Sequence, residues 1–193
     1  QIAALEYFKN AANLAPKDTG CWLRLGQCLS MQQYKDAALI AFQNALKISP
    51  KDFHALTLMG TTLQSLERHE EALELFSKAR KLHPKNAQSF FKEGQQYQTL
   101  GDFAKAREFF ERAIKINPNL VEAHTKLAGM ATDPKELDEA IEKLKVLAGQ
   151  KDIRPNLRAN ALFAAARVSQ KQKQHTEAFD FYRQANNQLR DKV

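Results

Sequence analysis

The stretch that decides the fold is residues 90–118, FFKEGQQYQTLGDFAKAREFFERAIKINP. Its glycine, alanine, phenylalanine and proline positions recur along the chain with a period of 34 residues. The recurring prolines are Pro16, Pro50, Pro84 and Pro118, and the glycines are Gly26, Gly60 and Gly94. The other columns are Phe8, Phe42, Phe76 and Phe110; Ala4, Ala38, Ala72 and Ala106; and Ala11, Ala45, Ala79 and Ala113. Self-similarity at a fixed period of this length indicates a repeat protein.

The spacing within one period predicts a pair of antiparallel helices. Trp22, Leu25 and Leu29 lie on one face of the first helix, and the phenylalanine and alanine columns lie on one face of the second. The glycine lets two helices approach closely, which explains its presence despite its low helix propensity. Proline ends the second helix, and an aspartate or asparagine two residues later can cap the next helix. The predicted caps are Asp18, Asp52 and Asn86.

This pattern resembles the tetratricopeptide repeat (TPR) family. The residues that carry the resemblance best are Phe90, Gly94, Tyr97, Gly101, Ala106, Phe110, Ala113 and Pro118. The resemblance implies an all-α fold, a right-handed α-solenoid of antiparallel helix pairs (the TPR superhelix), with about eleven helices.

The register divides the chain into repeats of one expected TPR domain that spans 1–193, and we expect this domain to be a fragment of a longer protein. The expected units are a half repeat at 1–18, full repeats at 19–52, 53–86 and 87–120, a degenerate repeat at 121–158 and a last repeat at 159–193. In the degenerate repeat Leu147 replaces an expected alanine, and an insertion precedes Pro155. We expect looser packing there.

Composition excludes several classes of protein. Hydrophobic residues make up 44% and charged residues 26%, and the low Gly and Pro counts of 7 and 6 argue against disorder. Apolar runs such as 37–42 are too short to cross a bilayer, so we expect no membrane insertion. Cys21 and Cys28 are too few for a disulfide scaffold or a four-cysteine metal site. With no Asn-x-Ser/Thr acceptor, the chain fits a reducing, cytoplasmic setting.

No catalytic pattern is present, so the chain itself is not expected to be an enzyme or to hold a cofactor or metal. The segment from His69 to Leu73 begins like a zinc-protease helix but lacks its second histidine. The net charge of +7 raises the possibility of nucleic-acid binding. The aromatic residues fall in core columns, however, where bases cannot stack on them, which argues against it.

The family resemblance implies that the inner, concave faces of the first helices recognise peptides. The expected groove residues are Arg24, Gln27, Thr61, Gln64, Phe91, Lys92, Gln95, Lys126 and Arg167. The cations would form a broken stripe, and Phe91, with Phe163 as a second exposed phenylalanine, would offer an apolar anchor. The lining therefore suits an acidic peptide with one bulky apolar side chain. The alternative is a merely solvated helix face.

The residues at the inner-face positions exclude one TPR sub-type. The clamp that binds the C-terminal carboxylate of heat-shock chaperones needs a Lys–Asn, Asn and Lys–Arg pattern on successive first helices, and no window of this chain supplies it.

The leading functional prediction is a non-catalytic protein–protein interaction scaffold or adaptor. The alternative is the N-terminal docking or regulatory domain of a larger enzyme. The last repeat, with 162–166, 178–186 and 189–190, resembles the repeat that precedes the catalytic domain of bacterial TPR-sulfotransferase proteins. Any such catalytic domain would lie beyond Val193.

Overall fold

The computed structural model describes residues 2–190, with side-chain exposure for residue 6 and for 8–190. Within this range it contains eleven α-helices. They are α1 (Ile2–Leu14), α2 (Thr19–Met31), α3 (Lys35–Ile48), α4 (Phe53–Ser65), α5 (His69–Leu82), α6 (Ala87–Thr99), α7 (Phe103–Ile116), α8 (Val121–Met130), α9 (Pro134–Ala148), α10 (Pro155–Lys171) and α11 (His175–Arg190). The predicted class is confirmed: an all-α fold of the solenoid class, built from sequential antiparallel helix pairs. The ends of the predicted domain, residue 1 and 191–193, lie outside the described residues.

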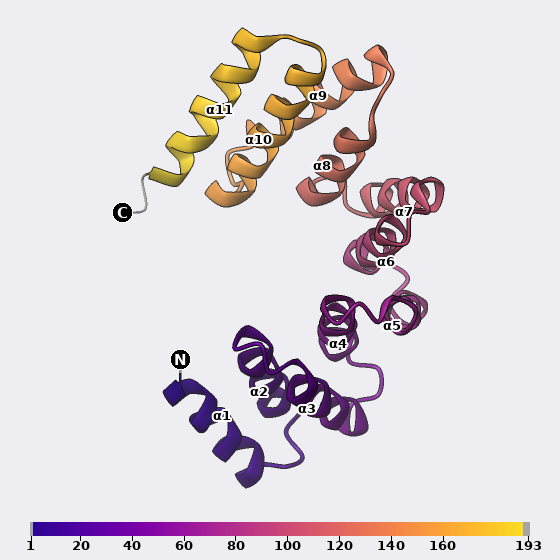
Figure 1. Ribbon diagram of the computed structural model, residues 1–193, viewed down its shortest axis with the longest axis vertical. Helices are drawn as coiled ribbons and strands as arrows, with labels where there is room; N and C mark the ends of the chain where they lie inside the picture. The colour runs from indigo at the N-terminus through magenta and orange to yellow at the C-terminus, as the bar shows by residue number, and fades with distance from the viewer. Residues whose placement is uncertain (1, 191–193) are drawn as a thin grey trace. The chain divides into compact units, whose positions relative to one another are not determined.

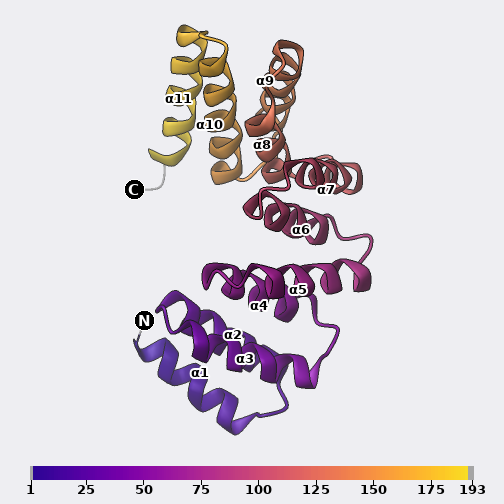
Figure 2. The same ribbon diagram turned by 45° about the vertical axis from the view of Figure 1, so that its right-hand side comes forward.

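The helices form two compact units, Gln1–Ala106 and Arg107–Val193. In the first unit α2 packs on α3, α4 on α5, and each pair packs on the next through α3 and α4 and through α5 and α6 (Figure 1). In the second unit α10 packs on α8, α9 and α11, and Figure 2 shows α10 and α11 side by side. A helix pair cannot bury its apolar stripe alone, so stacking on the neighbouring pair supplies the core of each unit.

The glycine columns sit where a phenylalanine ring of the second helix presses on the first. A Cβ added at Gly26 would lie 2.5 Å from Cε1 of Phe42, and one added at Gly60 would lie 2.7 Å from Cε1 of Phe76. Both rings are buried, each 1% exposed. The alanine columns are equally closed, since Ala38, Ala45, Ala72 and Ala79 are 0% exposed. Burial of Ala4 lies outside the described side chains.

The three predicted caps are confirmed. The Asp18 carboxylate accepts a hydrogen bond from the Gly20 amide at 2.7 Å, and Asp52 accepts one from the Ala55 amide at 2.7 Å. The Asn86 side chain accepts from the Gln88 amide at 2.9 Å. Each therefore satisfies one backbone N–H that the first turn of a helix leaves without an intrahelical partner.

The fourth pair, α8 and α9, departs from the pattern. Each of α3, α5 and α7 begins nine residues after the glycine column, whereas α9 begins at Pro134, six residues after Ala128, which holds that column. The cause is local: Asp133 accepts hydrogen bonds from the amides of Lys135 and Glu136, and Pro134 stands in the first turn of α9. As a result α8 has ten residues, against thirteen in α2, α4 and α6.

Leu147 belongs to the core of the second unit. Its side chain is 4% exposed and packs in the cluster that includes Leu144, Ala159 and Leu162. Because α9 begins early, Leu144 and not Leu147 takes the place on this helix that Ala45, Ala79 and Ala113 hold on α3, α5 and α7.

A buried ion pair joins α5 to α6 in the first unit. Glu93 takes the column that Leu25 holds in the first full repeat, yet it is only 2% exposed. Its Oε2 accepts a hydrogen bond from Nε of Arg80 at 2.6 Å, and the Arg80 guanidinium lies 5.8 Å from the centre of the Phe90 ring. The charge of Glu93 is thus paired, which a buried carboxylate requires.

Candidate functional site

A pocket in the first unit gathers three of the predicted groove residues. Arg24 and Gln27 reach it from α2 and Thr61 from α4. The pocket has a volume of about 580 Å³, within the range of about 300–1,000 Å³ usual for ligand pockets. Its remaining lining is mostly apolar: Phe8, Cys28, Ser30, Met31, Phe42, Leu58 and Thr62. We call it the α2–α4 pocket.

Arg24 supplies the only formal charge among the residues that line the α2–α4 pocket. Its side chain is exposed, and its Nη1 donates a long hydrogen bond of 3.5 Å to Oε1 of Gln27 on the same helix. Met31 at the rim is 74% exposed. The pocket thus combines an apolar wall with one cation on its border and no acidic group.

The other predicted residues of the first unit do not line this pocket. Gln64 donates from Nε2 to the Thr99 hydroxyl at 3.3 Å, which links α4 to α6, and Lys92 and Gln95 are half-buried on α6. The expectation of an exposed anchor at Phe91 is wrong, because that side chain is only 4% exposed. The reason is that α6 is buried around much of its circumference, so the consecutive residues Phe90 and Phe91, about 100° apart around the helix, are both covered.

Two predicted groove residues belong to the second unit. Lys126 on α8 is half-buried and Arg167 on α10 is exposed, and neither lines a pocket described in that unit. Phe163 on α10 is half-buried, with its ring centre 6.1 Å from that of Tyr182 on α11. The broken cationic stripe that these residues were expected to form along the groove stays a prediction.

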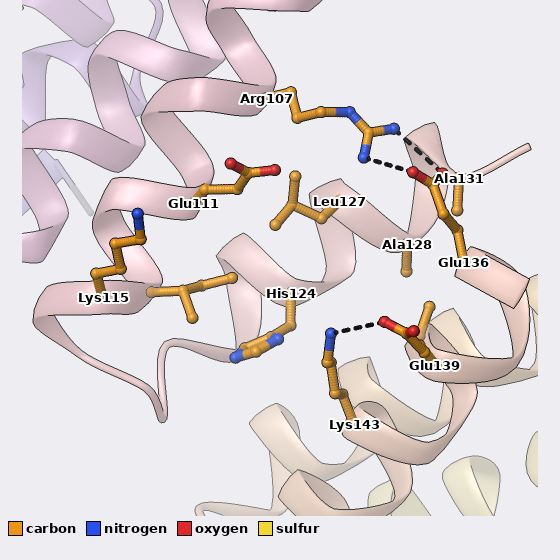
Figure 3. Close-up of a pocket in the computed structure, with 12 residues that line it drawn as sticks. Arg107, Glu111, Lys115, His124, Leu127, Ala128, Ala131, Glu136, Glu139 and Lys143 are labelled. Atoms are coloured by element: carbon orange, nitrogen blue, oxygen red, sulfur yellow. Dashed lines mark hydrogen bonds and ion pairs between the residues drawn. The ribbon is translucent and has the colours of Figure 1, made fainter.

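A second pocket, of about 430 Å³, lies among α7, α8 and α9 of the second unit (Figure 3). Its floor is apolar, with Ile114, Leu127, Ala128, Ala131 and Ala140, and its rim is charged, with Arg107, Glu111, Lys115, Glu136, Glu139 and Lys143. His124 completes the lining. We call it the α7–α9 pocket, and none of the nine predicted groove residues lines it.

Two ion pairs flank the α7–α9 pocket. Arg107 on α7 binds the Glu136 carboxylate of α9, with 3.2 Å between Nη1 and Oε1, and its Nη2 also donates to the Met130 carbonyl at 3.4 Å. Lys143 pairs with Glu139 one turn away on α9, at 3.5 Å. Figure 3 shows the Glu111 side chain extending from α7, between Arg107 and Lys115, toward the side of Leu127. Among the described residues, the side chain of Glu111 makes no hydrogen bond or ion pair.

His124 takes the place of a tryptophan in the repeat. Trp22 donates from Nε1 to the Pro16 carbonyl at 3.0 Å, and His124, in the same column, bonds through Nε2 to the Pro118 carbonyl at 2.9 Å. Burial lowers the pKa of His124 below its ordinary value of 6.5, and the positive charge of Lys143 lowers it further, while the bond to Pro118 opposes this. A neutral imidazole with its proton on Nε2 satisfies that carbonyl.

Repeat columns contain the signal that could have revealed the α7–α9 pocket. The column of Trp22, Leu56 and Phe90 continues with His124, and the column of Leu29, Leu63 and Tyr97 continues with Ala131. Large side chains are thus replaced by smaller ones at two positions of one repeat, and both of these residues line the pocket. The inner-face positions of the first helices do not by themselves show which core columns hold smaller side chains.

Both cysteines are free thiols. Cys21 donates from Sγ to the Asp18 carboxylate at 3.4 Å, and this bond raises the pKa of the Cys21 thiol. Cys28 instead lines the α2–α4 pocket. Among residues 2–190 no group of three or more His, Cys, Asp or Glu side chains is placed to hold a metal ion. None of the helices described here has the length and apolar character that crossing a membrane requires.

Solved structures with a similar fold include MamA, YrrB and a chain of the APC/C hetero-tetramer Cut9–Hcn1. MamA is 21% identical over 90% of this chain and 93% of its own, with a TM-score of 0.62. YrrB, described as a TPR protein with an unusual peptide-binding site, is 23% identical over 98% of this chain and 95% of its own, with a TM-score of 0.58. A chain of the APC/C hetero-tetramer Cut9–Hcn1 has a TM-score of 0.78 at 16% identity, over 94% of this chain and 35% of its own. At these identities the likeness is one of fold.

Sequence comparison identifies the family. No curated protein matches the chain. Three family models, each described as tetratricopeptide repeat, match residues 19–52, 52–119 and 91–156, and together these spans run without a gap over most of the chain. The chain belongs to the tetratricopeptide repeat family.

Proposed function

We propose that this chain is a non-catalytic interaction module, a scaffold or adaptor that binds peptide segments of other proteins on the faces of its first helices. TPR domains typically mediate protein–protein interactions, and the family found here is not a catalytic one. The fold is shared with YrrB, which is described as having an unusual peptide-binding site, so peptide binding is compatible with this fold.

The observation that carries the proposal is the α2–α4 pocket. Its apolar wall can take one bulky side chain, and Arg24 on its border can pair with a nearby carboxylate. The amide of Gln27 and the hydroxyl of Thr61 can bond a peptide backbone. The ligand class is therefore an acidic peptide segment with an apolar anchor. Single segments bound on one such surface reach affinities on the order of micromolar.

The experiment measures peptide binding by fluorescence anisotropy. The peptides are three labelled nonamers with a central leucine, flanked by glutamates, by lysines or by serines. The acidic nonamer should bind best, and Arg24→Glu should weaken it at least tenfold without lowering the melting temperature. Lys47→Glu is the matched control, because Lys47 is also exposed but does not line the pocket.

Cys28 gives an independent readout of the same pocket. In a Cys21→Ser background, iodoacetamide can react with Cys28 alone, since these are the two cysteines of the chain. The acidic nonamer should slow that reaction by covering the thiol. Equal binding of all three nonamers, or labelling of Cys28 at an unchanged rate in saturating peptide, would refute a peptide site here.

Two further expectations remain proposals. A reducing, cytoplasmic location is supported by the two unpaired thiols Cys21 and Cys28. Attachment to a sulfotransferase-like domain is a statement about sequence beyond Val193, and no feature of the described helices favours it over the scaffold function.

A further inference from the structure

We propose that a stripe along α5 is a self-association surface, on which α5 of a second copy of this chain packs antiparallel about a two-fold axis. The stripe lines a pocket of about 670 Å³ at the boundary between α5 and α6. We call it the α5 stripe, and it consists of Glu70, Glu74, Ser77, Lys78 and Lys81. The inference goes beyond the peptide site on the first helices, because no residue of the α2–α4 pocket belongs to this stripe.

The spacing of the α5 stripe places its residues on one face of the helix. Neighbouring members are mostly three or four positions apart, so they form a row over about three turns. The two glutamates lie toward the N-terminal end of α5 and the two lysines toward its C-terminal end, as the helix dipole favours. All four charged residues are exposed, and among the described residues none of these four side chains makes a hydrogen bond or ion pair.

On α7 the charges at the same positions of the repeat are paired within the chain. Glu108 and Arg112 lie one period after Glu74 and Lys78, and their side chains form an ion pair at 2.9 Å. The spacing therefore allows a pair within one helix, yet on α5 no such pair is formed. The charges of the α5 stripe are available to a partner.

The order of the charges makes the α5 stripe complementary to itself. A two-fold axis brings the same patch of both copies together, so each contact between two different residues occurs twice. With the two α5 helices antiparallel and the axis near Ser77, Glu74 lies opposite Lys78 of the second copy. In the same arrangement Glu70 lies opposite Lys81 of the second copy. Opposite charges thus meet along the whole row, and the small side chain of Ser77 lets the helices approach at the axis.

Apolar groups beside the row supply contact area. Leu73 and Leu82 are half-buried and line the same pocket, as does Tyr97 of α6. Two helices that meet over three turns fall at or below the roughly 1,200 Å² of the smallest standard interfaces, so we expect a weak dimer with a dissociation constant on the order of 10–100 μM. A helix of another protein is the competing occupant. The charge order favours the second copy, because its complement is already present in this chain.

Charge reversal tests the pairing, with the oligomeric state of the whole chain measured by analytical ultracentrifugation up to about 1 mM. The parent chain should pass from monomer to dimer as its concentration rises. Glu70→Lys with Glu74→Lys should weaken self-association at least tenfold, because every charge of the stripe is then positive. Lys78→Glu with Lys81→Glu should do the same, because every charge is then negative. An equimolar mixture of the two variants should recover dimers, since one stripe is then fully basic and the other fully acidic.

A matched control separates the stripe from net charge. Lys51→Glu with Lys85→Glu makes the same change of net charge as the acidic variant, at exposed residues outside the α5 stripe. This control should dimerise like the parent chain. It should not recover dimers of the variant with Glu70→Lys and Glu74→Lys, because its own stripe still carries two lysines.

A cysteine at the axis locates the interface. In a chain with Cys21→Ser and Cys28→Ser, oxidation of Ser77→Cys should give disulfide-linked dimers much faster than oxidation of Gln43→Cys, which is exposed at the same position of α3. Arg24→Glu should leave dimerisation unchanged, which separates this surface from the peptide site. Three results would overturn the proposal: a parent chain that stays monomeric, which would leave the stripe to a helix of another protein; reversed variants that dimerise as tightly as the parent; or a mixture of them that stays monomeric.

Discussion

Replacing Gly60 with alanine tests the close contact between a glycine of the first helix and a phenylalanine of the second, which the structure shows at Gly26 and Gly60. The new Cβ would lie 2.7 Å from Cε1 of Phe76, 3.0 Å from Cζ and 3.1 Å from Cδ1. Carbon atoms pack best at about 3.5–4.0 Å, so the ring would have to move by about 1 Å. Phe76 is 1% exposed and packs with Leu39, Leu63 and Ala72, so the ring cannot move without displacing the core.

Two opposing contributions set the change in unfolding free energy that Gly60→Ala should cause. Overpacking of a core typically costs about 1–3 kcal/mol, while alanine is favoured over glycine inside a helix by about 1 kcal/mol. A reference variant with the second contribution alone is Gly129→Ala in α8, because Gly129 is exposed and a Cβ there would meet nothing within 4 Å. The difference in unfolding free energy between Gly60→Ala and Gly129→Ala is therefore expected to be about 1–3 kcal/mol.

The assay is urea denaturation of both variants and the parent chain, followed by circular dichroism at 222 nm. Native-state hydrogen exchange of the α4 and α5 amides then locates the effect, since a repeat protein can lose stability locally. Gly60→Ala should cost less stability in a Phe76→Leu background than in the parent chain, because the smaller leucine side chain makes room for the new Cβ. Equal stability of Gly60→Ala and Gly129→Ala, or a loss that Phe76→Leu does not reduce, would show that close approach is not the reason for the glycine.

Three further predictions concern polar groups. Glu93→Ala should destabilise the first unit by about 1–3 kcal/mol because the partly buried Arg80 guanidinium loses the carboxylate that pairs with it. The double variant Arg80→Met with Glu93→Leu should be neutral or more stable in urea denaturation. The pKa of His124 is lowered by burial, so the unfolded chain takes up the proton first as the pH falls below about 6.5. Melting temperatures should therefore fall more steeply below that pH in the parent chain than in His124→Gln. Asp133→Ala removes the cap of α9 and should cost about 0.5–2 kcal/mol, measured as a lower urea midpoint.

Much of the fold could be predicted from residue spacing alone, because the residues that set helix ends and helix contacts recur within each repeat. The period of 34 residues predicts helix pairs, and the caps at Asp18, Asp52 and Asn86 act over two or three residues, so no knowledge of distant contacts is needed. The glycine columns likewise predict close approach between neighbouring helices, which the structure confirms at Gly26 and Gly60. Local and nearest-neighbour rules suffice in a repeat protein, because each repeat contacts mainly the next one.

The candidate sites were less predictable. Arg24, Gln27 and Thr61 do share a pocket, as their register on α2 and α4 implied. Phe91 does not face solvent, because exposure depends on how many sides of a helix are covered, and a helical pattern alone does not report this. The α7–α9 pocket is lined in part by the small side chains of Ala131 and Ala140. It lies where Asp133 and Pro134 start α9 early. An empty volume exists only between packed elements, so sequence by itself determined the repeat and its helix pairs, and tertiary packing alone decided which columns closed and which stayed open.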